Sequence, residues 1–490
     1  MHELRSSTRP RPVFWAILGL AIAIRIILLP IPNTDDDISL QTWSRIVTVE
    51  GFHNIYNVYD PIGMPPEECQ YPPGYLYVLW LLGKIYQHFF SHGFQQEKIL
   101  FLIMLRIPTV LADLALGVMI FRAIGRWWGA RAAHFAFAAY VLSPAMILDS
   151  TIVTQIDSVQ SLLMVGTILL LVAGKDAAAI ACLALAVLTK LQAVILAPLV
   201  LATVAGRGNW RALFHGAGAS AAFFLTLALP FIMNDKMPDL IRTLVTPIGT
   251  IPVLSANAFN LWWLASAGHG WQSDTGHFLG FLTPRILGLA MLGTSTLMAV
   301  RRVCIDRSRD SIILSASFIC FSFFVVCTQM TERYVLAALP LLLLIAPSDR
   351  RFSRIYGVLA ITIFINLYIV FPLLRIYPWD ALNLPHSNYF HYPRGDAGLE
   401  VKDLFLDPDG VIHRSSFVSA MPPVNHDLQA TSKIAGVATP LAVLSLASPT
   451  NRLYISIGIS LIHVMMLGYI AITVLTWRRT APILPDIPES

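Results

Sequence analysis

The sequence is poor in charge and in cysteine. Only 13% of its 490 residues are Asp, Glu, Lys or Arg, whereas soluble globular proteins carry roughly 25%, and 56% of the residues are apolar. This balance excludes a soluble enzyme of several domains. The cysteines lie mostly within apolar runs and show no paired spacing, so the sequence indicates neither a disulfide framework nor a zinc site. They are Cys69, Cys182, Cys304, Cys320 and Cys327.

The motifs of several large enzyme classes are also missing. The chain has no glycine-rich phosphate loop, no G-x-S-x-G elbow and no H-E-x-x-H pair, so a soluble nucleotide donor would lack its usual binding loop. The net charge of +5 could suggest an acidic partner, but much of the arginine lies in short loops between apolar runs, where it indicates topology. Nucleic acid is therefore not an expected partner.

Apolar runs of membrane-spanning length recur along the whole chain. We therefore expect one all-α, polytopic integral membrane protein with about twelve transmembrane helices rather than a string of domains. The spans are predicted at 13–29, 103–121, 132–148, 156–173, 177–205 (two short helices), 213–233, 278–300, 312–327, 335–346, 355–373 and 453–477.

Arginine clusters between the spans predict the topology. Cytoplasmic loops carry an excess of Lys and Arg, and clusters at 5–11, 122–131, 207–211, 301–309, 350–354 and 478–479 place both chain ends in the cytoplasm. Three long segments then lie outside, at 31–102, 234–277 and 374–452. The organisation expected is a membrane module at 1–373, an outer segment at 374–452, and a last helix with its tail at 453–490.

Charge also decides two ambiguous runs. If 74–90 crossed the membrane, the arginine cluster at 122–131 would lie outside, so we expect 74–90 to form an interfacial helix on the outer face. The run 177–205 is too long for one ordinary span and contains Lys190 and Gln192 in its middle. We expect two short helices that meet at Lys190, near the outer side.

The remaining polar residues collect on the predicted outer face. An ammonium within an apolar run costs on the order of 2.5–3.5 kcal/mol, so Lys190 needs a partner or water. Each of the other groups also has a structural interpretation: three aspartates as a solvated loop start, Asp157 as a helix cap, Glu332 with Arg333 as a mutual ion pair. The candidates are Asp35, Asp36, Asp37, Tyr71, Gln155, Asp157, Lys190, Gln192, Asn257, Glu332, Arg333 and Tyr334.

Two charged residues, Arg106 and Asp113, lie within the second predicted span. They are about two helical turns apart, so they could pair with each other or with another span. We interpret them as structural supports.

Carboxylates that can act as a base and cations that can hold a phosphate would meet at the outer membrane boundary. This combination suits group transfer from a lipid-linked phosphate, in which the cations neutralise the leaving phosphate and a carboxylate takes the acceptor proton. The chemistry needs no cofactor in principle. Three adjacent aspartates could nevertheless hold a divalent cation through oxygen ligands.

Six short motifs follow one another in an order that resembles the GT-C glycosyltransferases, over roughly 11–346. Asp36 precedes Trp43 by seven residues, and the others are Tyr71-Pro72-Pro73-Gly74, Thr154-Gln155-Ile156-Asp157, Lys190-Leu191-Gln192, Asn257-Ala258-Phe259-Asn260 and Met330-Thr331-Glu332-Arg333-Tyr334. Within these enzymes the chain is most similar to the branch of dolichyl-phosphate-glucose-dependent glucosyltransferases and their bacterial relatives.

The resemblance implies a function. A hexose, glucose or mannose, would be transferred with inversion from a polyprenyl-phosphate-sugar. The acceptor would be a lipid-linked or cell-surface glycan on the non-cytoplasmic face. Asp36 would be the general base, with Asp35 or Asp37 as alternatives. Lys190, Gln192, Arg333, Glu332, Gln155 and Asp157 would bind the donor. Two motifs depart from the family pattern, because Val153-Thr154 replaces Trp-Gly and Thr331 replaces His.

Two other interpretations compete. A multi-pass transporter or flippase of a lipid or small solute is favoured by the pair of short helices at Lys190, because many transporters bind their substrate at broken helices. An inactive scaffold or lipid-binding subunit is favoured by Thr331 and by the altered motif around Gln155. As to location, a bacterial inner membrane is preferred to the endoplasmic reticulum, since the C-terminus carries no K-D-E-L retention signal.

Overall fold

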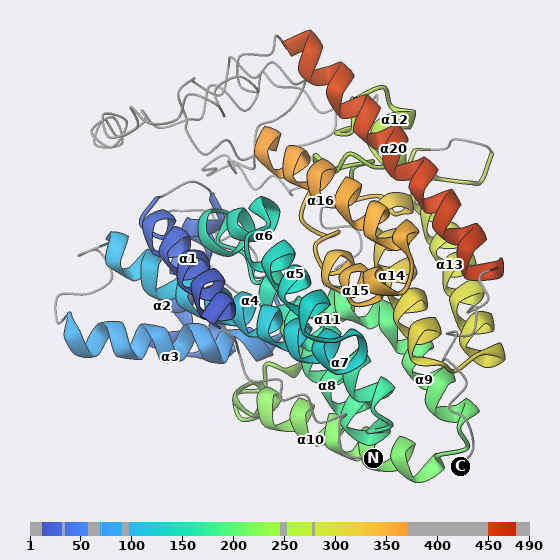
Figure 1. The fold of residues 1–490 in the computed structure, drawn as a ribbon. Helices are drawn as coiled ribbons and strands as arrows, with labels where there is room; N and C mark the ends of the chain where they lie inside the picture. Colours follow the sequence, from blue (N-terminus) through green and yellow to red (C-terminus); the bar gives the residue numbers. More distant parts are fainter. Residues whose placement is uncertain are drawn as a thin grey trace.

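The computed structural model describes residues 12–31, 35–56, 69, 71–90, 98–245, 252–276, 280–370 and 449–476. These residues form helices joined by turns, with three isolated β-bridges and no named strand among them (Figure 1). The predicted all-α fold is confirmed. The predicted outer segment 374–452 lies almost wholly outside the described residues.

The helices follow one another with short connections. The first half contains α1 (Pro12–Leu28), α2 (Asp35–Val49), η1 (Phe52–Asn54), α3 (Pro73–Phe89), α4 (Lys98–Trp128), α5 (Ala130–Val141), α6 (Pro144–Leu148), η2 (Asp149–Val153), α7 (Asp157–Val172), α8 (Asp176–Thr189), η3 (Leu191–Leu196) and α9 (Ala197–Gly206). The second half contains α10 (Trp210–Ile232), α11 (Met237–Val245), α12 (Leu261–Ala265), α13 (Pro284–Ile305), α14 (Arg309–Val326), α15 (Ala338–Ile345), η4 (Ala346–Ser348), α16 (Arg350–Val370) and α20 (Pro449–Thr476).

Many of these helices suit a membrane. Six are long and apolar enough to cross one, and α5 with α6 makes a seventh if the bent pair counts as one span. Five shorter apolar helices lie at 12–28, 157–172, 176–189, 191–206 and 338–348. The chain is thus a multi-pass membrane protein, while the total of about twelve spans stays a prediction.

Several predicted spans differ from the observed helices at their ends. The span 132–148 is bent by 46° before Pro144, whose ring cannot continue the preceding helix. The span expected from 278 begins at Pro284, after Thr283 caps the helix by accepting a hydrogen bond from the Ile286 amide. The predicted break in 177–205 is confirmed, because α8 ends at Thr189 and Lys190 is extended.

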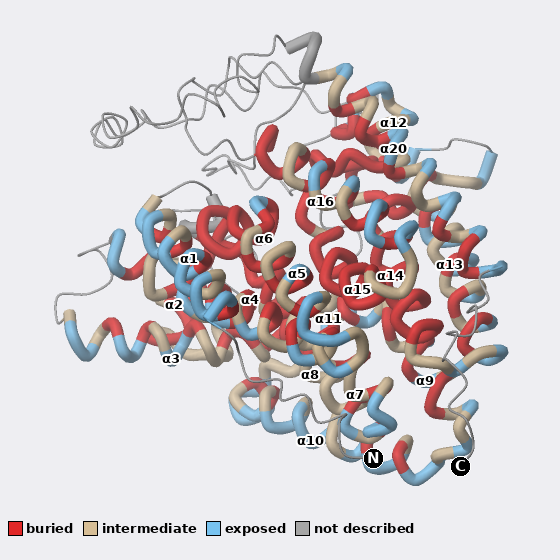
Figure 2. Tube along the Cα trace, viewed as in Figure 1, coloured by how far each residue is buried: buried red, intermediate tan, exposed pale blue. Residues whose placement is uncertain are grey.

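The helix α14 forms the centre of the bundle. In α14, 89% of the apolar window is buried inside the protein, against 17% in α10 and 28% in α20. Figure 2 shows the same contrast, with α14 and α15 mostly buried and the outer faces of α10 and α13 exposed. Peripheral helices thus present apolar side chains outward, as expected of surfaces that contact lipid.

Helices α2 and α3 pack together at one edge of the molecule (Figure 1). A second apolar cluster lies beneath them and includes Trp43, Tyr71 and Tyr75. Helix α3 is not among the candidate spans, and its predicted place at the membrane surface stays untested. The three aspartates 35–37 open α2 rather than a loop, because acidic residues favour the first turn of a helix. The expected loop start is thus a helix start, while the side chains of these aspartates lie outside the described residues.

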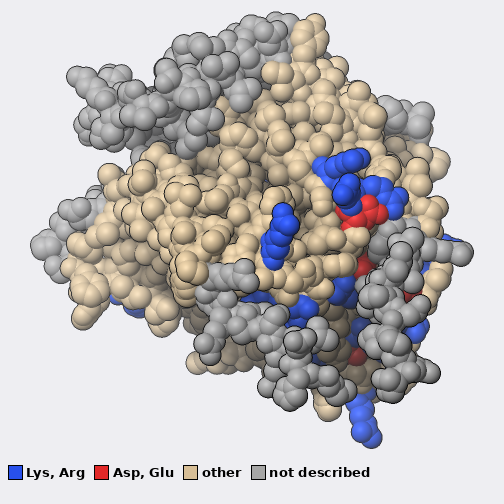
Figure 3. All heavy atoms as spheres, viewed as in Figure 1, with Lys and Arg blue, Asp and Glu red and all other residues tan. Residues whose placement is uncertain are grey.

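The contacts join segments that the charge pattern places on the same side. On the predicted cytoplasmic side, Arg207 pairs with Asp176, and Arg309 lies over the rings of Trp127 and Trp128 at 4.6 and 5.0 Å. The face seen in Figure 3 is uncharged over most of its area, and the visible charges gather toward one part of it. This distribution fits a bundle whose sides face lipid and whose ends face water.

Candidate functional site

A buried charge cluster forms at the predicted outer end of the bundle. Lys190, at the break between α8 and η3, places its Nζ 2.7 Å from Oδ1 of Asp157, the first residue of α7. The other oxygen of Asp157 lies 3.8 Å from Nε of Arg333, whose Nη1 donates to Glu332 at 3.1 Å. All four residues are buried. Residues from three distant parts of the sequence thus meet, as the one-sided distribution of polar residues predicted.

The cluster decides between the interpretations of its members. Lys190 has the partner that its burial requires. Asp157 lies in the first turn of α7, as the helix-start interpretation expected, and its carboxylate also accepts a hydrogen bond from Lys190. The mutual pair of Glu332 and Arg333 exists, yet Arg333 also faces Asp157, so it belongs to the larger cluster.

Two aromatic rings flank the Lys190 ammonium. Its Nζ lies 5.9 Å from the ring centre of Tyr71 and 5.2 Å from that of Tyr334, within the range of cation–π attraction. The Tyr71 hydroxyl donates a short hydrogen bond to Oε1 of Gln155. Two predicted residues from separate motifs are therefore in direct contact.

The first outer segment is fastened to this cluster through Tyr71. The Tyr56 hydroxyl donates to the Tyr71 carbonyl at 2.7 Å, and Trp43 packs edge-on against the Tyr71 ring at 5.0 Å. Burial, and then the neighbouring Cys69 thiol, raises the pKa of Tyr56 well above its usual value, so Tyr56 remains a donor at physiological pH. Helix α2, which carries Trp43, is thereby held near the cluster.

A small cavity lies between α7, η3 and α14. Gln192 and Tyr334 line it, and the side-chain oxygen Oε1 of Gln192 has no hydrogen-bond partner among the described residues. The other lining residues are Gln160, Met164, Ile195, Cys320, Phe323 and Ala337. The cavity is lined by two side-chain amides and mostly apolar side chains, and one lining residue, Tyr334, also flanks the Lys190 ammonium.

Five residues other than glycine have positive φ in the described part of the chain, and three of them lie at or beside the motifs; the other two are Asp235 and Ala267. Thr154 (φ 59°) precedes Gln155, Asn257 (66°) begins the Asn-Ala-Phe-Asn motif, and Gln329 (64°) precedes the Met-Thr-Glu-Arg-Tyr motif. A β-branched residue such as Thr154 rarely adopts this conformation, which costs about 1–3 kcal/mol and is found most often at functional sites. The strain therefore supports a functional role for these turns.

The Asn257 segment lies against the Arg333 segment. Ala256 and Asn257 form β-bridges with Thr331, and the Asn257 amide oxygen accepts from the Trp271 indole at 2.9 Å. Asn257 thus supports the cluster through the backbone of Thr331.

Buried residues that the sequence did not single out hold these turns. Asp274 accepts from Arg285, Thr328 and Gln329, while Asn366 of α16 bonds to Asn257 O and Phe259 N. His463 of α20 contacts Phe259 O at 2.7 Å. Their signal in the sequence was weak, because an isolated polar residue does not reveal which loop it contacts.

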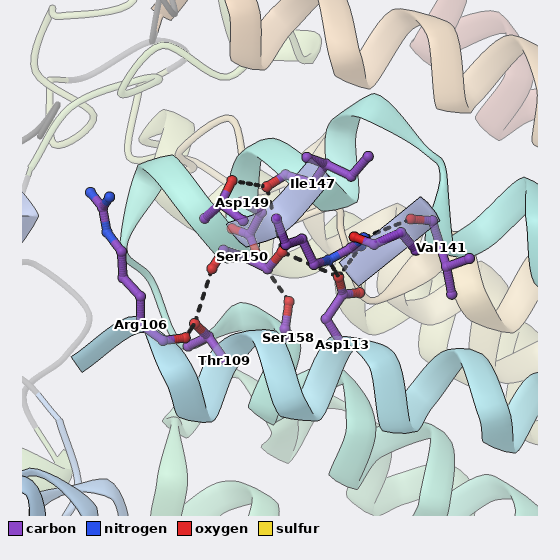
Figure 4. A network of polar contacts seen from close by, with 11 residues as sticks. Arg106, Thr109, Asp113, Val141, Ile147, Asp149, Ser150 and Ser158 are labelled. Carbon is purple, nitrogen blue, oxygen red and sulfur yellow. Dashed lines mark hydrogen bonds and ion pairs between the residues drawn. The ribbon is translucent and has the colours of Figure 1, made fainter. Parts of the chain in front are cut away.

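A second polar network lies beside the cluster (Figure 4). Ser158, the neighbour of Asp157, donates to Asp149 at 3.2 Å, and the second oxygen of Asp149 has no hydrogen-bond partner within the described residues. Sequence reasoning missed Asp149.

The residues Arg106 and Asp113 do not pair with each other: Asp113 accepts from Arg25 of α1 at 2.5 and 3.0 Å, because α1 packs beside α4. This corrects one alternative for that pair.

The side chains of Asp35, Asp36 and Asp37 lie outside the described part of the chain. Among the residues that the structure does describe, no group of three or more His, Cys, Asp or Glu could hold a metal ion.

The chain is similar to a known protein family and to a solved structure. The model of glycosyltransferase family 87 matches residues 70–328, more than half of the chain. A solved structure, that of ArnT from Cupriavidus metallidurans bound to undecaprenyl phosphate, is similar at a TM-score of 0.48 and 17% identity, over 94% of this chain and 78% of that one. No curated protein matches the sequence.

Proposed function

The chain belongs to glycosyltransferase family 87, and from this premise we propose that it transfers a hexose from a polyprenyl-phosphate-hexose to a glycan. The acceptor is lipid-linked or on the cell surface, and transfer takes place on the non-cytoplasmic face. The enzyme is of the GT-C type, related to the dolichyl-phosphate-glucose branch, and lies in a bacterial inner membrane.

The buried cluster of Lys190, Asp157, Arg333 and Glu332 is the observation that carries this proposal. Two buried cations in an apolar bundle suit a phosphate whose lipid tail stays in the membrane. When the donor phosphate arrives, Lys190 and Arg333 exchange part of their carboxylate contacts for phosphate oxygens. Gln155, Gln192 and Tyr334 supply further polar groups for the phosphate or the sugar.

The reaction is a single displacement with inversion. The acceptor hydroxyl oxygen attacks C1 of the hexose as the bond from C1 to the phosphate oxygen breaks, and the acceptor proton passes to the Asp36 carboxylate. The leaving group is polyprenyl phosphate, whose added negative charge is stabilised by Lys190 and Arg333. Asp35 and Asp37, the neighbours of Asp36, are the alternative bases. The step uses no cofactor, and we expect transfer to continue in the presence of EDTA.

The rival function is transport of a lipid or small solute across the membrane. The broken helix at Lys190 is the feature that favours it. Membership of a glycosyltransferase family supports transfer instead. Purified protein in liposomes that moves a lipid between leaflets without consuming any sugar donor would decide for transport.

The test is transfer from labelled polyprenyl-phosphate-glucose and polyprenyl-phosphate-mannose by purified protein, with membranes of cells that lack the gene as the source of acceptor. We expect product from one donor and a loss of about 100-fold or more in Lys190→Met, because one charged group on the leaving phosphate is removed. The exposed Lys175 offers the matched control Lys175→Met, with the wild-type rate. Equal rates in both variants would contradict the proposal.

A further inference from the structure

Arg106, a fully buried arginine of α4, lies in none of the six motifs, yet it joins two segments that lead into the proposed site. Its Nε donates to the Thr154 hydroxyl at 2.7 Å. Its Nη1 donates to the carbonyl oxygens of Leu29 at 2.7 Å and Ile31 at 2.8 Å, and its Nη2 to that of Ile152 at 3.1 Å. One side chain thus contacts the end of α1, η2 and the turn before α7.

The carbonyl groups that accept from Arg106 explain why this position carries an arginine. Leu29 and Ile31 follow the last residue of α1, and Ile152 lies near the end of η2, where helix carbonyls lack partners within the helix. Inside a membrane no water can satisfy such carbonyls. The guanidinium offers five donors in a rigid fork, whereas a lysine ammonium offers three on a flexible stem.

Both segments are next to groups of the proposed site. Ile31 is four residues before Asp35, where α2 begins, and Thr154 immediately precedes Gln155. The strained φ of Thr154 is held by the same hydrogen bond. A second link runs from Trp43 of α2 through Tyr71 to Gln155, so one contact chain reaches Ile31 before α2 and another reaches α2 itself.

We propose that Arg106 is a positioning residue for glycosyl transfer. It holds the start of the first outer segment, and with it the base Asp36, at a fixed distance from the turn that carries Gln155 and Asp157. The inference rests on the proposed function. The two proposed phosphate ligands, Lys190 and Arg333, are held through their own contacts with Asp157.

The first test is Arg106→Lys, which keeps the charge and loses the fork. We expect kcat to fall by about tenfold or more, because a small displacement of the base from the acceptor is costly. The KM for the polyprenyl-phosphate-hexose should change by less than about threefold, because the phosphate contacts remain. A residue that only stabilises the fold would not produce this separation of kcat from KM.

A smaller change is Thr154→Val, which has the same shape and removes the hydroxyl that accepts from Arg106 Nε and donates to Ile152 O at 3.2 Å. We expect a smaller fall in kcat than in Arg106→Lys. Adding Thr154→Val to Arg106→Lys should cause no further fall, since both changes break the same hydrogen bond between Arg106 and Thr154. The single variant Thr154→Val keeps the test decisive if Arg106→Lys folds poorly.

The matched control is Arg302→Lys, which alters another buried arginine at the opposite end of the bundle, bonded to Ser311. It should lower the melting temperature with unchanged kcat per folded enzyme. Wild-type kcat in Arg106→Lys, or an equal fall in Arg302→Lys, would overturn the role of Arg106 even if Lys190→Met abolishes transfer. If the wild-type protein transfers no hexose from either donor, the proposed function fails and this inference fails with it.

Discussion

At the scale of single residues, Lys190 and Asp157 show how a membrane protein keeps charge inside an apolar body. Removing one partner of such a pair leaves an uncompensated buried charge, while removing both can be nearly neutral. We therefore expect Lys190→Met to lower the unfolding free energy by about 3–5 kcal/mol and the double change Lys190→Met with Asp157→Leu to recover most of it.

Folding stability and hexose transfer should respond differently in the double variant. Stability returns, but transfer does not, because the phosphate still lacks its cation. Thermal unfolding and transfer rates on the same preparations test this expectation. If transfer returned together with stability, Lys190 would be a structural residue only.

Thr331 replaces the histidine of related motifs, and its hydroxyl has no hydrogen-bond partner among the described residues although the residue is buried. Thr331→Val keeps the shape and should leave stability within about 0.5 kcal/mol, since no bond is lost in the free protein. If the hydroxyl binds the donor, the KM for the donor rises. An unchanged KM would remove Thr331 from the donor site.

Part of the site could be predicted from single residues. The cost of burying Lys190 predicted a partner, but not that the partner is Asp157, because sequence spacing does not reveal which helices are neighbours. The same limit explains Asp113, whose partner is Arg25 of α1. Asp149 was missed because a polar residue at the end of a predicted span resembles an ordinary helix end.

At the scale of elements, α20 supports the Asn257–Asn260 motif from far along the chain. His463 contacts Phe259 O and the Thr362 hydroxyl, so its replacement leaves a buried carbonyl without a donor. His463→Leu should lower the unfolding free energy by about 1–3 kcal/mol. His463→Asn, which can still donate to Phe259 O, should lose less, and thermal melting of both variants tests the contact. Equal losses would mean that packing alone matters.

The breaks between elements were partly predictable. Length and polarity predicted the break at Lys190, and the structure confirms it. The bend before Pro144 and the five-residue π-helix η2 were not predicted, because an apolar run shows no period change there. These irregular turns are the ones that carry Asp149, Thr154 and Gln155, so the parts hardest to predict are those nearest the site.

At the scale of the whole molecule, the arginine clusters predict which end of the bundle faces the cytoplasm. Single cysteines can test this in a variant whose native cysteines are replaced by alanine. The exposed Lys175 and Asp235 lie on opposite predicted sides. In intact cells a membrane-impermeant maleimide should label Asp235→Cys and not Lys175→Cys. The reverse pattern would place the charge cluster on the cytoplasmic face.

The most direct measurement for the proposed transferase is the rate of hexose transfer in Asp36→Asn, compared with Asp35→Asn and Asp37→Asn. We expect Asp36→Asn to lose about 100-fold or more in kcat with little change in the KM for the donor, because a general base contributes that much and does not bind the phosphate. The two neighbouring variants should stay within about tenfold of the wild type. A wild-type rate in Asp36→Asn would contradict the account.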